Sequence, residues 1–73
     1  MADIKIKSEV TGSVWKIEKQ VGDAIASGDI IMLIESMKME IPVISEDSGT
    51  LSEILVKQGD SVAEGGVVAI VKG

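Results

Sequence analysis

The chain has 73 residues, enough for one small domain, and its 7 lysines and 12 acidic residues give it a formal net charge of −5. This acidic balance disfavours nucleic-acid phosphates and anionic membranes as binding partners. Cysteine and histidine are both absent, which excludes disulfides, a thiolate nucleophile, a Cys/His metal site and histidine acid–base chemistry.

Short apolar runs separated by glycines favour β-strands along the whole chain. The fully apolar runs 30–34 and 67–71 are expected to be buried on both faces. Pro42 falls inside a strand, so that strand should lie at the edge of a sheet or leave this position unpaired. In chain order we expect strands at 3–7, 13–18, 30–35, 40–44, 50–56 and 67–71, with short extended pieces near 24–26 and 61–63.

The sequence repeats itself after 37 residues without a gap, and 9 of the 36 aligned pairs are identical. We therefore expect a single domain over residues 1–73, with internal repeats at 1–36 and 38–73. Eight short strands in two related copies predict an all-β fold. The expected architecture is a flattened eight-stranded barrel or sandwich, built from two four-stranded halves related by a quasi-two-fold axis.

The join between the repeats contains Lys38, which is flanked by Met37 and Met39. The strand at 30–35 has to reverse into the strand at 40–44 within about four residues, which places the turn at Met37 and Lys38. Two-residue turns favour Asn-Gly or Asp-Gly because they need positive φ, so Met-Lys is a poor local choice. A four-residue loop built on a type I turn would remove that demand.

A lysine in a surface turn is usually only solvated, and methionine is usually core filler. The placement of Lys38 favours a function nonetheless, because local rules tend to fail at functional sites. The flanking methionines offer a flexible apolar surface to a partner. The other six lysines lie in predicted strands or near the ends of those strands.

The segment Glu-Ser-Met-Lys-Met-Glu at 35–40, followed by Pro42, resembles the attachment signature of biotinyl domains, the biotin carboxyl carrier family. The resemblance covers essentially the whole chain and includes Gly-Asp-x-[Ile/Val]-Ala-x-Gly in both repeats. It implies the biotinyl/lipoyl barrel-sandwich hybrid fold with quasi-two-fold symmetry. The chain has no room for the protruding thumb of some bacterial carriers, and Ser36 stands where many family members have alanine.

The resemblance implies that Lys38 carries biotin, joined through an amide by an ATP-dependent biotin protein ligase. The biotin arm would then move a carboxyl group between biotin carboxylase and carboxyltransferase sites, so the domain is a carrier and not an enzyme. Met37 and Met39 correspond to the residues that flank the family's attachment lysine. Glu35, Ser36 and Glu40 are candidates for recognition by the ligase or another partner, although two exposed acids could equally serve only for solubility.

Several alternatives stay open. A lipoyl carrier on the same scaffold, or an acceptor of both biotin and lipoate, is the nearest, although lipoyl domains usually show Asp-Lys-Ala at the turn. An unmodified β-domain that only docks partners belongs to a different class. A hydrolase or transferase is disfavoured because no suitable catalytic set is present. We expect a cytoplasmic location, because no signal peptide or membrane span is evident. We expect a monomer, because one sandwich uses all the apolar content, and the carboxyl acceptor is not indicated.

Overall fold

The fold is described from a computed structural model over residues 3–73; residues 1 and 2, with which the predicted domain and its first repeat begin, lie outside the described residues. The described residues form eight strands, within one or two residues of the predicted positions at most strand ends. They are β1 (Asp3–Lys7), β2 (Gly12–Ile17), β3 (Ala24–Ile25), β4 (Ile30–Ser36), β5 (Met39–Ile44), β6 (Gly49–Ile54), β7 (Ser61–Val62) and β8 (Val67–Lys72).

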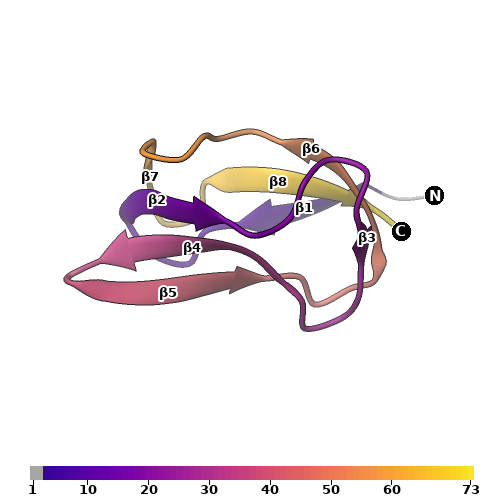
Figure 1. Cartoon of the computed structure of the whole chain (residues 1–73), viewed down its shortest axis with the longest axis horizontal. Helices are drawn as coiled ribbons and strands as arrows, with labels where there is room; N and C mark the ends of the chain where they lie inside the picture. The colour runs from indigo at the N-terminus through magenta and orange to yellow at the C-terminus, as the bar shows by residue number, and fades with distance from the viewer. Residues whose placement is uncertain (1–2) are drawn as a thin grey trace.

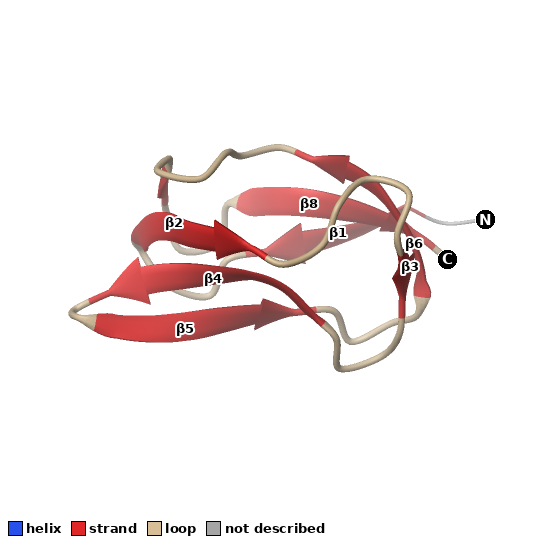
Figure 2. Ribbon diagram, in the orientation of Figure 1, coloured by secondary structure: helices blue, strands red, loops and turns tan. Residues whose placement is uncertain are grey.

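The strands form two four-stranded sheets that face each other (Figure 1 and Figure 2). One sheet has the order β1-β8-β6-β3, here called sheet A, and the other has the order β5-β4-β2-β7, here called sheet B. All strand pairs within the sheets are antiparallel. The predicted all-β fold of eight strands is therefore confirmed.

A shift of 37 residues maps each strand of one sheet onto a strand of the other, so that β1, β8, β6 and β3 correspond to β5, β4, β2 and β7. Even the irregularities correspond. The pairing of β2 with β4 shifts between Val14 and Lys16, and the pairing of β6 with β8 shifts between Leu51 and Glu53. Each repeat contributes two strands to each sheet, so neither repeat forms a sheet on its own.

The core lies between the two sheets and consists almost entirely of aliphatic side chains. The prediction that 30–34 and 67–71 are buried on both faces is wrong. Ile30 is 39% exposed, and Leu33 and Ile70 are only half-buried. The reason is that residues 3–73 form only the two sheets, so the strands have one side toward the core and the other toward solvent. The completely buried apolar residues are Ile31, Met32, Ile34, Leu51, Ala69 and Val71.

Strand β5 lies at the edge of sheet B, which confirms the position expected from Pro42. The longest dimension of the chain is 36 Å and the other two are 18 Å. The β4–β5 hairpin forms one end of the long axis, and β1 begins and β8 ends at the other (Figure 1). Within residues 3–73 there is no helix long and apolar enough to cross a membrane.

Candidate functional site

The turn between β4 and β5 consists of only two residues, Met37 and Lys38, because Ser36 pairs directly with Met39. Met37 has a φ of 53° and Lys38 a φ of 64°. Positive φ at both central positions is the backbone of a type I′ hairpin turn, whose twist matches that of the flanking strands. The predicted position of the turn is confirmed, but the four-residue loop on a type I turn is wrong.

This turn holds non-glycine residues in a conformation that L-residues disfavour. Elsewhere in residues 3–73, positive φ occurs only at glycines, namely Gly22, Gly28, Gly59 and Gly65. The left-handed conformation costs a residue with a Cβ roughly 1–2 kcal/mol. Such strain is retained where the surrounding structure forces it, and it concentrates at functional sites. Here the pairing of β4 with β5 imposes it on Met37 and Lys38.

The base of the hairpin is fastened to two neighbouring loops. Ser36 Oγ donates a hydrogen bond of 2.8 Å to the backbone oxygen of Thr11. Thr11 Oγ1 in turn accepts a hydrogen bond of 3.1 Å from the backbone N–H of Glu64. Gly12 lies so close beneath β4 that a Cβ at this position would overlap the backbone oxygen of Glu35. The turn is therefore presented on a supported base.

The side chains of the turn point into solvent. Met37 is 92% exposed and Met39 is 60% exposed, which is unusual for methionine. Lys38 is also exposed. The ion pairs of the described residues are Lys16–Glu18 at 3.5 Å and Lys19–Asp29 at 3.8 Å, and neither involves Lys38. The arrangement offers an accessible primary amine between two apolar side chains.

Two carboxylates flank the turn on the same face of the hairpin. Glu35 at the end of β4 pairs directly with Glu40 at the start of β5. Both side chains are exposed. Like charges directly opposite each other across a strand pair destabilise the pair. The corresponding pair in sheet A is Asp3 with Lys72, which carries opposite charges.

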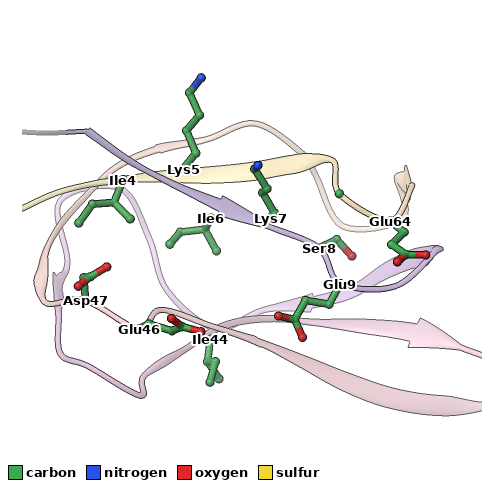
Figure 3. A pocket seen from close by; sticks show the side chains of 11 residues that line it. Ile4, Lys5, Ile6, Lys7, Ser8, Glu9, Ile44, Glu46, Asp47 and Glu64 are labelled. Carbon is green, nitrogen blue, oxygen red and sulfur yellow. The ribbon is translucent and has the colours of Figure 1, made fainter.

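A groove of about 600 Å³ runs along the seam between the edge strands β1 and β5 (Figure 3). Ile4, Ile6 and Ile44 contribute apolar side chains to it, and Glu9 and Glu64 lie at its end. Lys5 and Lys7 point away from the seam in Figure 3. None of the six predicted site residues lines this groove. Among residues 3–73 there is no cluster of three or more side chains suited to hold a metal ion.

All six predicted site residues lie on one hairpin: Glu35, Ser36, Met37, Lys38, Met39 and Glu40. The supporting residues Thr11 and Gly12 were not predicted. Gly12 left a signal in the sequence, because Gly49 matches it in the second repeat and is equally close to the backbone oxygen of Lys72. Thr11 left no signal in the sequence, since its role depends on a hydrogen bond with Ser36, which is 25 residues away along the chain.

Comparison with known proteins finds sequence relatives over part of the chain. The biotinylated protein TB7.3 of Mycobacterium tuberculosis is 46% identical over 39 residues, which is 53% of this chain and 55% of that protein. A biotin/lipoyl attachment protein of Bacillus subtilis is 40% identical over 39 residues, 53% of each chain. The matches thus span about half the length of these relatives.

Solved structures extend the likeness to nearly the whole chain. The urea carboxylase of Kluyveromyces lactis superposes with a TM-score of 0.94 and 39% identity, over 99% of this chain and 6% of that one. A single-chain, multi-domain long-chain acyl-CoA carboxylase shares the fold, with a TM-score of 0.85 and 19% identity, over 97% of this chain and 7% of that one. A biotin/lipoyl family model, described as "Biotin-requiring enzyme", matches residues 3–71. This chain therefore belongs to the biotin/lipoyl attachment family.

Proposed function

We propose that Lys38 is the residue to which biotin is attached, and that the domain carries this biotin for a carboxylase. The supporting observation is an exposed lysine held in a two-residue turn at the far end of the β4–β5 hairpin. Membership of the biotin/lipoyl family and the biotinylated relatives agree with it. The other described lysines lie in strands or in the loops between them.

In this proposal the Lys38 amine is the nucleophile in an acyl transfer. Its nitrogen attacks the acyl carbon of biotinyl-adenylate, an amide bond forms, and AMP leaves with the electrons of the broken bond. The attacking nitrogen has to be unprotonated and loses a further proton as the amide forms, so the ligase has to pass these protons to its own basic groups or to water. The contribution of this chain is presentation, because the turn holds the amine clear of the sheets.

The remaining site residues have supporting roles. Met37 and Met39, which precede and follow Lys38, offer exposed apolar surface to the enzymes that bind this turn. Glu35 and Glu40 offer charge for recognition, and Ser36 fastens the base of the hairpin. Bound biotin would carry a carboxyl group from a biotin carboxylase to a carboxyltransferase. The domain brings the carrier to both sites and catalyses neither step, and we propose that it does so as a cytoplasmic monomer.

The test is to co-express the chain with a biotin protein ligase and to measure intact mass and capture by streptavidin. We expect the wild type to gain the mass of one biotinyl group. The Lys38→Arg variant should gain none, because an arginine side chain does not form the amide. Its thermal unfolding should match that of the wild type, since the exposed position is surrounded by solvent. Labelling of Lys38→Arg at another lysine would contradict the assignment.

A lipoyl carrier is the second candidate, and the name of the Bacillus subtilis relative favours testing it. The same chain should be co-expressed with a lipoate ligase and lipoate. A gain of lipoyl mass at Lys38 together with biotin would indicate an acceptor for both groups, and lipoyl mass alone would replace the biotin assignment. No gain with either ligase would indicate a docking module.

A further inference from the structure

The two sheets have equivalent outer faces, but the side chains on those faces differ. In sheet B, Ile30 pairs with Ile44 and Leu33 pairs with Pro42. Val43 is buried in the core, so its neighbours on β5 at positions 42 and 44 point outward. Cross-strand partners share a face, which puts Ile30 and Leu33 on the outside as well. Ile30 is 39% exposed and Ile44 is 46% exposed.

Trp15 joins this surface through an irregularity in β2. Val14 pairs with Ile34 and Lys16 pairs with Leu33, which leaves Trp15 as an extra residue between them. Val14 is buried and Ile17 packs against the core, so the two residues between them both face outward. Trp15 is the only aromatic residue of the chain and is 43% exposed. Sheet B therefore has an outer face, here called the apolar face, made of Trp15, Ile30, Leu33, Pro42 and Ile44.

The repeat supplies an internal comparison for this face. The backbone of sheet A repeats the same pairings, including the same irregularity between Leu51 and Glu53. Three of the five apolar residues are replaced there by polar ones, since Ser52, Lys5 and Lys7 correspond to Trp15, Pro42 and Ile44. The scaffold does not require apolar side chains at these three positions, because sheet A forms the same pairings with polar residues there. The corresponding residues of sheet A are Ser52, Val67, Ile70, Lys5 and Lys7.

The outer faces of the two sheets also differ in charge. On sheet B, the next outward-facing pair between Leu33–Pro42 and the turn is the like-charged pair of Glu35 and Glu40. The nearest lysine on this face, Lys16, already pairs with Glu18 at 3.5 Å. A cationic group of a partner between the two carboxylates would relieve their repulsion. The partner surface that fits is therefore apolar in its centre and basic where it meets the turn.

We propose that the apolar face docks the biotin protein ligase while that enzyme acylates Lys38; this inference rests on the proposed function. An unmodified lysine amine extends only four methylene groups from the backbone, so the enzyme that acylates it must place its own surface against the hairpin. Enzymes that act on the ring of an attached biotin can stay farther from the hairpin, because the lysine and biotin chains together separate the ring from the backbone. The acid pair adjoins the turn on sheet B, and the apolar face follows it along the same strands as far as Ile30 and Ile44 at their other ends. A ligase surface that reaches the amine from this side and extends along the hairpin covers both.

The experiment exchanges residues between the two faces. The first variant is Trp15→Ser with Ile44→Lys, which gives sheet B the residues of sheet A. The matched control is Ser52→Trp with Lys7→Ile, which makes the reverse change on sheet A. Steady-state biotinylation is measured with a biotin protein ligase, biotin, ATP and varied concentrations of each purified domain. Circular dichroism on heating establishes that each variant is folded at the assay temperature.

We expect the sheet B variant to raise KM for the domain about tenfold with little change in kcat, which is the loss of one well-packed apolar anchor. The sheet A variant should stay within about twofold of the wild type. An unchanged KM in the folded sheet B variant would overturn the proposal, and so would an equal rise in both variants. If the wild-type domain itself is not labelled, the proposed function fails instead, which keeps the two outcomes distinct.

Discussion

The strand pairs β4–β5 and β8–β1 occupy equivalent places in the repeat, yet their outer ends differ. A strained turn of Met37 and Lys38 joins β4 to β5, and Glu35 faces Glu40 across the pair. At the equivalent place β8 and β1 are not joined by a turn, and Lys72 faces Asp3. Both of these unfavourable local features therefore fall on the copy that carries the turn. The difference teaches that the duplicated backbone forms without either of them, and under the proposed function the β4–β5 copy alone serves recognition.

The largest expected effect is on stability and comes from the glycines beneath both strand pairs. An added Cβ in Gly12→Ala overlaps the backbone oxygen of Glu35, and in Gly49→Ala it overlaps that of Lys72. Each variant should lose about 2–3 kcal/mol of unfolding free energy, as expected for an overpacked interior. Urea denaturation followed by circular dichroism measures both values.

Biotinylation should separate these two glycine variants. Gly12→Ala displaces the strand end that leads into the turn, so its kcat/KM with the ligase should fall at a temperature where both variants are folded. Gly49→Ala displaces the chain end far from Lys38 and should be labelled like the wild type. Equal labelling of the two would mean that the support beneath β4 does not position the amine.

A smaller effect is expected from relieving strain in the turn. Met37 adopts a φ of 53°, which glycine accepts without the penalty of a Cβ. After the extra backbone entropy of glycine is subtracted, Met37→Gly should stabilise the domain by about 0.5–1 kcal/mol. The control is Met39→Gly, in a regular strand, which should destabilise it by about the same amount. A loss of stability in both variants would show that the turn is not strained.

The smallest expected effect is electrostatic. Glu35→Lys places opposite charges across β4 and β5, as in β8 and β1, and should raise stability by a few tenths of a kcal/mol. The gain should shrink as salt is added. Biotinylation should nonetheless slow, because the ligase no longer finds the Glu35 carboxylate that it is proposed to recognise. The mirror variant Lys72→Glu should lower stability and leave labelling unchanged, and slower labelling of that variant would contradict the assignment of recognition to one end.

Much of the fold could be predicted because the sequence contains the same strand pattern in two repeats. Gly12 and Gly49, and the segments 22–28 and 59–65, recur after 37 residues, so one interpretation had to satisfy both copies. Strand positions followed from apolar runs with breaks at glycine. The exchange of strands between the sheets was not predictable, because a repeat defines equivalent strands but not their neighbours. Half-exposed Ile30 and Leu33 escaped prediction because apolar runs look alike whether one or both faces are covered.

The candidate site was found from the sequence because its residues are contiguous. Lys38 and its neighbours on either side could be read as one segment, and a conflict with turn chemistry drew attention to it. The two-residue turn itself was not predicted, since local preference argues against Met-Lys at positive φ. Only the alignment of β4 with β5 across their whole length shows that no further residue is available for the loop.

The placement of the start of β1 and the end of β8 has a mechanical consequence. Both lie at the end of the domain opposite the turn, along an axis of 36 Å (Figure 1). Any polypeptide joined there would leave the amine unobstructed. The domain would then behave as a lever that pivots about its tether, so that a given rotation at the joint moves Lys38 farther than it moves residues nearer to the joint.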